Sequence, residues 1–203
     1  MASTSPRRRQ LLTEHGFRFS VLDPGIDDGK LDTPSHLEPK HWATALAYLK
    51  ATAAVRFARA QQLSMAPGTI VLGADTVVVK HDRMVSKPVD AADADSMIRM
   101  LRGGSHRVFT GVAIVCPASG RRHLFADFAT VTVGDVPDDT LAAYIASNQW
   151  SGKAGGYNLF ERIAAGWPIT WQGDATTIVG LPITALIAAL RRFSAAAPAS
   201  IIN

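Results

Sequence analysis

The N-terminal segment carries the residues best suited to bind an anion. Small hydroxyl residues lead into Pro6, and three consecutive arginines follow, Arg7, Arg8 and Arg9. Ser5 is a suitable N-cap and Pro6 fits the first helical position, so unpaired backbone N–H groups should gather here. A helix N-terminus attracts phosphate, and arginine adds paired donors that match phosphate oxygens. The segment therefore predicts a phosphate site, although a solvated basic arm has the same composition.

Four more charged residues stand where burial is costly without a partner. Lys50 lies beside the inward side of an expected helix, Asp75 follows an apolar run, Lys87 precedes a proline, and Lys153 lies in a glycine-rich string. A charge near a core must pair with another charge or face a charged ligand. A structural ion-pair network accounts for any one of them. Taken together with the arginines, they favour an anionic ligand.

Composition and motifs narrow the class of protein. The chain has 203 residues, 47% of them hydrophobic, and a net charge of +4, which permits either nucleic acid or a small anionic substrate. No apolar run reaches membrane-spanning length, and no secretory signal follows the arginines, so we expect a cytoplasmic protein. The lone Cys116 cannot form an intramolecular disulfide, which agrees with a reducing compartment.

Several familiar chemistries lack their motifs. The chain has no P-loop order of glycines and lysine, no His-Glu-x-x-His and no Gly-x-Ser-x-Gly. A single cysteine excludes a cysteine-based zinc site. Oxygen-ligated magnesium or manganese remains possible.

The periodicity of apolar residues predicts the elements that must position these groups. A helix over 39–62 should bury the stripe Trp42, Leu46, Leu49 and Ala53, while Arg56 and Arg59 face solvent. A strand buried on both faces should end just before Asp75. The other expected elements are a strand over 17–21, a hairpin over 77–85, a helix over 90–101, strands over 106–116 and 122–133, and helices over 138–147 and 181–193. One domain over 1–193 and a tail over 194–203 follow from the absence of a linker.

Six motifs, spread over residues 2 to about 190, occur in the order found in one protein family. They are Ala2-Ser3-Thr4-Ser5-Pro6-Arg7-Arg8, Gly73-Ala74-Asp75-Thr76, Lys87-Pro88, His106-Arg107-Val108-Phe109-Thr110-Gly111, Trp150-Ser151-Gly152-Lys153-Ala154-Gly155-Gly156-Tyr157 and Val179-Gly180-Leu181-Pro182. The chain thereby resembles the Maf family of nucleoside triphosphate pyrophosphatases. The resemblance implies a Maf- or ITPase-like α/β fold, with an elongated mixed sheet flanked by helices and a cleft between two lobes. It also implies a divalent cation, Mg²⁺ or Mn²⁺, and a homodimer.

The resemblance assigns roles position by position. Asp75 matches the catalytic carboxylate and metal ligand, and Arg7 and Thr76 match positions that discriminate between substrates. The residues that match groups facing the triphosphate are Ser3, Arg8, Lys50, Lys87 and Lys153. A second acidic metal ligand corresponds to Asp27 or Asp28, of which we favour Asp28.

Two departures from the family pattern affect the site. Only Met1 precedes Ala2, so the usual first strand should be nearly absent and Ser3 less well anchored. Where the dTTP- and UTP-preferring subgroup has glutamine, this chain has Phe160, followed by Glu161. Phe160 either stacks on a base, with Glu161 accepting hydrogen bonds from it, or packs in the core. Arg7 and Thr76 match the dTTP- and UTP-preferring subgroup and Phe160 does not, so the resemblance leaves the base open between dTTP or UTP and a modified nucleotide.

An alternative function is a non-catalytic nucleotide- or nucleic-acid-binding regulator of cell division. Its basic surface would combine the N-terminal arginines with Arg56, Arg59 and the pair Arg191 and Arg192, but no aromatic residues are interleaved with them. Nucleic acid is thus the less favoured partner. Trp167 and Trp171 are expected to be exposed, as a partner contact or a lid. The enzyme hypothesis requires that the Asp75 carboxyl and the cations of residues 7, 50 and 87 surround one hollow.

Overall fold

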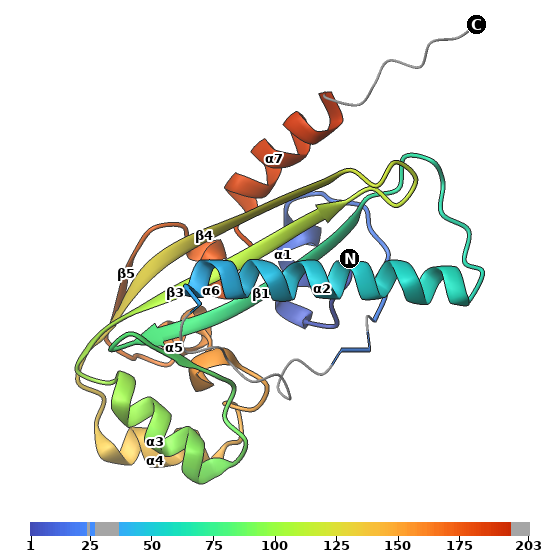
Figure 1. Ribbon diagram of the computed structural model, residues 1–203. Helices are drawn as coiled ribbons and strands as arrows, with labels where there is room; N and C mark the ends of the chain where they lie inside the picture. The colour runs from blue at the N-terminus through green and yellow to red at the C-terminus, as the bar shows by residue number, and fades with distance from the viewer. Residues whose placement is uncertain (24, 27–36, 196–203) are drawn as a thin grey trace, which may run out of the picture.

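The computed structural model describes residues 1–23, 25–26 and 37–195, which form one sheet with helices on both sides (Figure 1). In chain order the elements are α1 (Pro6–Glu14), α2 (Pro39–Ala60), β1 (Val71–Lys80), β2 (Arg83–Val85), α3 (Ala91–Leu101), β3 (Gly104–Val115), β4 (Arg122–Val133), α4 (Asp138–Ala146), the 3₁₀ turn η2 (Ala154–Gly156), α5 (Leu159–Ala164), β5 (Ile169–Gln172), α6 (Ala175–Val179) and α7 (Ile183–Ala195). None of these helices is long and apolar enough to cross a bilayer.

The strands form a sheet in the order β2-β1-β3-β4-β5, and each neighbouring pair is antiparallel. A parallel bridge between Ala2 and Gly73 adds the N-terminus to the outer side of β1. The predicted α/β fold with a sheet flanked by helices is confirmed. Its parallel component is this bridge rather than a full strand.

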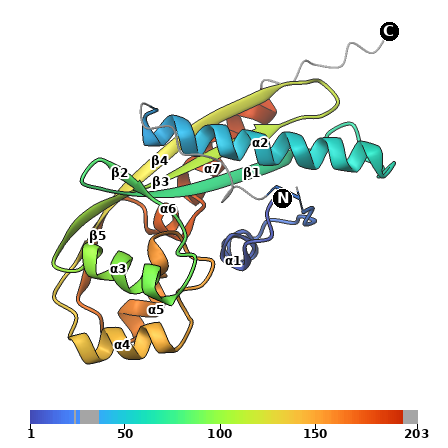
Figure 2. The same cartoon turned by 60° about the horizontal axis from the view of Figure 1, so that its bottom comes forward.

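The two faces of the sheet carry different helices. Successive side chains of a strand point to opposite faces. Val71 and Ala113 pack with Ala47 and Ala51 of α2, whereas the alternate positions of β1 and β3 pack against α1 and α7. Figure 2 shows α2 on one side of the strands and α1 on the other.

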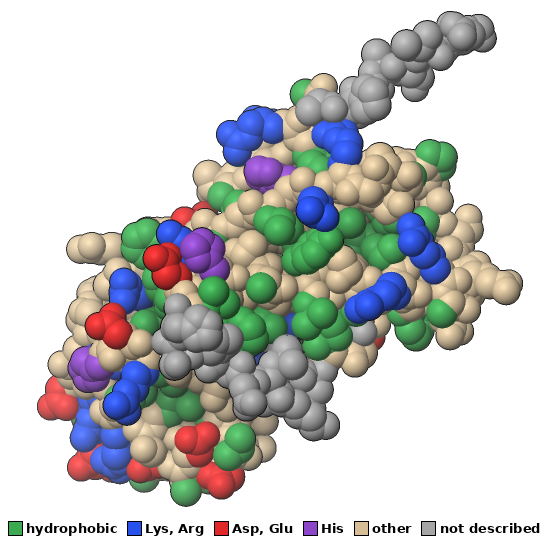
Figure 3. All heavy atoms as spheres, viewed as in Figure 1, with side chains coloured by type: hydrophobic (Ala, Val, Ile, Leu, Met, Phe, Trp, Pro, Cys, Tyr) green, Lys and Arg blue, Asp and Glu red, His purple; other side chains and the backbone are tan. Residues whose placement is uncertain are grey.

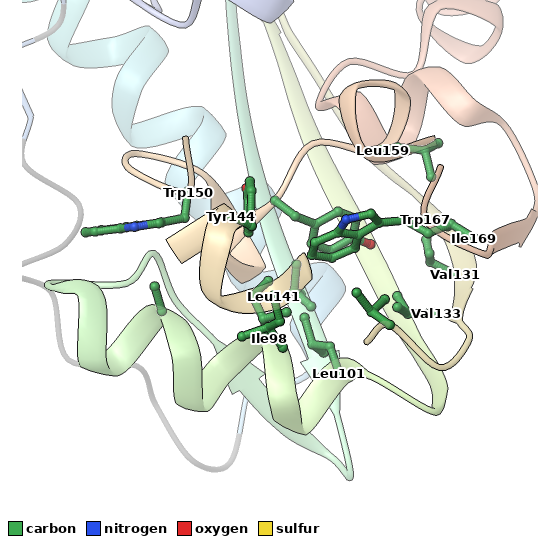
Figure 4. Packing of buried hydrophobic residues seen from close by; sticks show 14 of the residues in the cluster. Ile98, Leu101, Val131, Val133, Leu141, Tyr144, Trp150, Leu159, Trp167 and Ile169 are labelled. Atoms are coloured by element: carbon green, nitrogen blue, oxygen red, sulfur yellow. The ribbon is translucent and has the colours of Figure 1, made fainter. Parts of the chain in front are cut away.

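A second apolar cluster builds the lobe at the far end of the sheet. There α3 and α4 lie side by side and bury Ile98, Leu101 and Leu141 between them (Figure 4). Trp167 is 5% exposed and packs edge-to-face on Tyr144, with ring centroids 5.2 Å apart. The expectation that Trp167 is exposed is therefore wrong, because this lobe uses it as a core residue.

Two glycines let α2 approach the sheet at backbone distance. A Cβ built on Gly73 would lie 2.1 Å from the Ala47 carbonyl oxygen, and one on Gly111 would lie 2.3 Å from the carbonyl carbon of Ala43. Gly73 and Gly111 occupy neighbouring strands, β1 and β3. At these two positions α2 therefore packs directly against the strand backbone, and the helix side chains that face the glycines must be small.

This contact explains why the predicted inward stripe of α2 is wrong in part. The buried residues are Ala43, Leu46, Ala47, Lys50, Ala51, Ala54, Val55 and Ala58. Trp42 and Leu49 border a shallow groove on the outer surface, where Figure 3 shows hydrophobic side chains gathered over α2. Only small side chains fit opposite the two glycines, where Ala43, Ala47 and Ala51 lie, and the larger Trp42 and Leu49 are turned to the outer side.

Two strand predictions also need correction. Residues 17–21 form no strand in the structure. The expected buried strand does not end at Ala74, because β1 continues to Lys80 and pairs with β3 throughout, Asp75 opposite Gly111. The predicted hairpin of residues 77–85 exists, with its first arm forming the end of β1. The other predicted helices and strands are found within a few residues of their expected bounds.

We expect Gly73→Ala to lower the free energy of unfolding by about 2 kcal/mol or more, because overpacking against a fixed backbone forces the helix away from the sheet. Gly68→Ala is the matched control, since a Cβ there meets nothing within 4 Å. Urea denaturation of both variants measures the difference. Equal stability of the two variants would show that α2 can shift without loss.

Candidate active site

One cavity of about 410 Å³ lies between the N-terminal segment, β1 and the chain that precedes α5. Its wall is formed by Ser3, Thr4, Ser5, Pro6, Arg7, Arg8, Asp23, Ile26, Lys50, Asp75, Thr76, Val78, Lys87, Val108, Ser151, Gly152, Ala154, Tyr157, Asn158, Leu159, Ile178 and Val179. The Asp75 carboxyl and the cations of residues 7, 50 and 87 therefore do border one hollow. Of the other residues to which the family resemblance assigns a binding role, Ser3, Arg8 and Thr76 also border the cavity.

A buried ion pair stands at the wall of this cavity. Lys50 Nζ donates to Asp75 Oδ1 at 2.5 Å, and the residues are 7% and 5% exposed. Lys50 comes from α2 and Asp75 from β1. Removing two charges from water is costly even when they pair, so the pair is a poor device for stability alone. Its position at a cavity wall indicates a role in binding or chemistry.

The Arg8 guanidinium joins three separate segments. Its Nε donates to the Gly180 carbonyl oxygen at 2.8 Å, Nη1 to Ser3 Oγ at 3.2 Å, and Nη2 to Thr76 Oγ1 at 3.2 Å. These bonds connect α1 to the N-terminal segment, to the end of α6 and to β1. At least three of the five guanidinium N–H groups are thereby used within the protein.

Arg7, the neighbour of Arg8 in the sequence, borders the same cavity. Burial lowers the pKa of the Arg7 guanidinium from its ordinary value, an effect that the negative charge of Glu161 opposes. The group remains cationic at neutral pH, because arginine titrates far above that range. A partly desolvated guanidinium at a cavity wall is well suited to bind an anion.

The N-terminus is held in place although a full first strand is missing. Ala2 is 1% exposed and its N–H donates to the Leu72 carbonyl oxygen at 2.8 Å. The Met1 ammonium donates to the Ser20 carbonyl oxygen at 2.7 Å. Ser3 is 6% exposed, so the expectation that it is poorly anchored is wrong: backbone pairing to β1 substitutes for the strand.

Three of the predicted binding residues lie beside the cavity rather than on its wall. Lys153 and Glu161 form an ion pair with each other. Phe160 is 48% exposed, so it is no core residue, and it packs edge-to-face on Trp171 with centroids 6.3 Å apart. No atoms of these three residues line the cavity. Asp27 and Asp28, the predicted second metal ligand, lie outside the described residues.

The structure adds an acidic residue that the sequence analysis missed. Asp23 lines the cavity, and its Oδ1 accepts a hydrogen bond from the Gly25 N–H at 2.9 Å. In the sequence Asp23 stands before Pro24 and Gly25, residues typical of a turn, and nothing in that string indicates a ligand. Among the described residues no three acidic, histidine or cysteine side chains converge on one point. The described carboxylates at the cavity are therefore Asp23 and Asp75.

The chain is similar to known proteins over nearly its whole length. A family model described as Maf-like protein matches residues 1–193, so the chain belongs to the Maf family. A protein of Pelotomaculum thermopropionicum is 35% identical over 193 residues, which cover 95% of each chain. One from a Geobacillus species is 36% identical over 192 residues, 95% of this chain and 96% of the other. One from Nitratidesulfovibrio vulgaris is 37% identical over 195 residues, 95% of this chain and 86% of the other. Each of the three bears the name dTTP/UTP pyrophosphatase.

A buried histidine supports the cavity wall from behind. His106 of β3 is 3% exposed, and its Nε2 lies 2.7 Å from the hydroxyl of Tyr157, which borders the cavity. Its Nδ1 has no hydrogen-bond partner in the described part of the chain. Burial, reinforced by the charge of Lys80, lowers the pKa of His106 to about 4. The imidazole is therefore neutral in the folded protein at neutral pH.

We expect the free energy of unfolding to fall as the pH falls from about 6.5 towards 4. The unfolded chain takes up a proton on this histidine below pH 6.5, whereas the folded chain does so only near pH 4, so acid favours unfolding. Between pH 7.5 and 5 the loss from this group is about 2 kcal/mol. Urea titrations of wild type and His106→Gln should differ by this amount in their pH dependence. Parallel curves for wild type and His106→Gln would contradict the buried neutral imidazole.

Proposed function

We propose that this chain hydrolyses nucleoside triphosphates at the α–β phosphoanhydride, releasing a nucleoside monophosphate and pyrophosphate. The observation that carries the proposal is the Lys50–Asp75 pair at a cavity whose wall also holds Arg7, Arg8 and Lys87. A site that only bound phosphate would gain nothing from a carboxylate, which repels it. The names of the three relatives support the same activity.

In the reaction Asp75 acts as the base. Its carboxylate orients a water molecule and takes a proton from it, while the water oxygen bonds to the α-phosphorus. The bond from the α-phosphorus to the bridging oxygen breaks, and pyrophosphate leaves with the electron pair. Lys50 holds Oδ1 at 2.5 Å, so the carboxylate presents a fixed orientation to the cavity. Such positioning accounts for much of the catalysis in phosphoryl transfer.

The cations of the cavity stabilise the departing pyrophosphate. Negative charge builds on the leaving oxygens in the transition state, and fixed cations in a partly desolvated site lower its energy. Arg7 and Lys87 line the cavity, and Arg7 is partly buried. Arg8 contributes its charge while its bonds to Ser3, Thr76 and Gly180 keep the wall in shape.

The donor set fits a divalent cation of the magnesium type. Mg²⁺ is usually bound by one or two carboxylates together with substrate phosphates and water, and rarely by a cage of protein ligands. Asp75 and Asp23 are the described carboxylates that could hold it. When bound, the cation would neutralise phosphate charge and polarise the attacked phosphorus. Asp28 is proposed as an additional ligand.

For the nucleobase we propose uracil and thymine. The relatives named above are dTTP/UTP pyrophosphatases, and Thr76 lines the cavity here. Phe160 and Trp171 stand outside the wall, where a base-modified nucleotide could contact their exposed rings.

We expect Asp75→Asn to lose turnover by a factor of about 100 or more, because an amide cannot accept the water proton. The amide oxygen can still accept a hydrogen bond from Lys50, so the fold should be kept, but the free energy of unfolding should fall because the negative charge that faces Lys50 is removed. Asp82→Asn, at an exposed ion pair with Arg107, is the control and should keep wild-type turnover. Pyrophosphate release from dTTP and UTP is the measurement. More than half of the wild-type rate in Asp75→Asn would remove this carboxylate from the mechanism.

Chelation of divalent cations should abolish pyrophosphate release, because the carboxylates of Asp23 and Asp75 repel a triphosphate unless a divalent cation is bound with it. Addition of Mg²⁺ or Mn²⁺ in excess of the chelator should restore it. A rate unaffected by chelator would show that the cations of the protein suffice by themselves.

A further inference from the structure

A line of three polar groups runs from the cavity into the interior. Thr76 of β1 pairs with Thr110 of β3 in the sheet register, and their Oγ1 atoms lie 2.9 Å apart. Thr110 Oγ1 in turn lies 2.7 Å from the carbonyl oxygen of Thr177 in α6. Thr110 and Thr177 are fully buried, whereas Thr76 is partly exposed and borders the cavity.

The far end of this line is fixed. Thr177 Oγ1 donates to Asp127 Oδ2 at 2.5 Å, and the Thr177 carbonyl also accepts from the Gly180 N–H at 3.1 Å. The side chain of Asp174 caps the start of α6 by accepting from the Thr176 N–H. The Thr177 carbonyl is thus held in a single orientation towards Thr110.

Counting protons gives the direction of each hydrogen bond. A carbonyl only accepts, and a hydroxyl carries one proton. Without a proton between them, two oxygens at 2.7 Å would repel, so Thr110 donates to the Thr177 carbonyl. Its proton is then used, and Thr76 must be the donor in the 2.9 Å contact with Thr110.

The hydrogen bond from Arg8 agrees with Thr76 donating its proton to Thr110. Arg8 Nη2 donates to Thr76 Oγ1 at 3.2 Å, which requires the threonine oxygen to act as an acceptor. The Thr76 oxygen therefore has its proton turned inward and one lone pair occupied by Arg8. What it presents to the cavity is one further acceptor and no donor.

We propose that Thr110 is a specificity-determining positioning residue, which makes the Thr76 hydroxyl an obligate acceptor towards the nucleobase. The inference rests on the proposed function and deepens it. Uracil and thymine carry an N–H donor at ring position 3, whereas cytosine carries a lone pair there. A cytosine at this point would set two acceptors against each other in a partly buried site, a mismatch that reduces kcat/KM strongly.

The experiment compares kcat/KM for UTP and CTP in wild type, Thr110→Val and Thr110→Ser. In Thr110→Val the Thr76 hydroxyl loses its acceptor, becomes free to rotate and can donate to cytosine. We expect the UTP/CTP ratio to fall about tenfold or more, a size typical of one hydrogen bond to a buried group. Thr110→Ser keeps the hydroxyl and should restore the wild-type ratio. Thr132→Val, which removes a hydroxyl from β4 that bonds to Ser105, is the control and should leave the ratio unchanged.

A purely structural role for Thr110 would lower kcat/KM for both nucleotides equally, and that result would overturn the inference. Thr76→Val and the double variant with Thr110→Val should have the same UTP/CTP ratio, because Thr110 acts through Thr76. If Thr110→Val does not fold, Thr110→Cys supplies a weaker acceptor of similar size and should lower the ratio in the same direction. An unchanged ratio in that variant would also overturn the inference.

The outcomes separate this inference from the proposed function. Absence of pyrophosphate release by wild type from every nucleotide would overturn the function and the inference with it. Wild-type hydrolysis together with a UTP/CTP ratio that Thr110→Val leaves intact would overturn the inference alone. Binding of UTP and CTP to Asp75→Asn, measured by calorimetry, gives the same preference without turnover and should favour UTP.

Discussion

The site depends on the backbone contact between α2 and the sheet. Because Gly73 and Gly111 have no side chains, the helix lies directly on β1 and β3, and its alanines fill the remaining space. At this distance Lys50, one turn beyond Leu46, reaches Asp75 from the helix. A larger separation would leave both charges desolvated but unpaired, which is far more costly than the pair itself. The glycines thus determine the geometry of the carboxylate although they touch no ligand.

The N-terminal segment is held by hydrogen bonds rather than by close backbone packing. A single parallel bridge from Ala2 to Gly73 fixes the chain just before Ser3, and α1 begins at Pro6. The hydrogen bonds of the Arg8 side chain then connect the start of α1 to β1 and to the end of α6. Both arginines border the cavity, but their surroundings differ: Arg8 donates at least three hydrogen bonds within the protein, whereas burial lowers the pKa of the Arg7 guanidinium. Under the proposed function the two arginines have complementary parts, because the bonds of Arg8 hold the wall on which Arg7 would meet a phosphate.

The sequence predicted the elements whose signals are local. The helix after Asp90, the strands of the β3–β4 hairpin and the start of α1 follow from periodicity, caps and turns. The sequence predictions were wrong where contacts with a distant segment determine the structure. The length of β1 beyond Asp75 depends on pairing with β3, the inward side of α2 depends on two glycines far along the chain, and Trp167 is buried because Tyr144 covers it. The cations were identified from the motifs, whereas Asp23 was missed because its string indicates only a turn.

Asp75 and Thr76 are neighbours in sequence but are supported from opposite faces of the sheet. Asp75 is held by Lys50 of α2, and Thr76 by Arg8 of α1 and, through Thr110, by α6. This separation follows from the alternation of side chains along a strand. These hydrogen bonds of the Asp75 and Thr76 side chains thus come from different helices, even though both residues border one cavity. Under the proposed function, a change at Thr110 would act on the side of the sheet that carries α6, whereas the hydrogen bond between Lys50 and Asp75 lies on the side that carries α2.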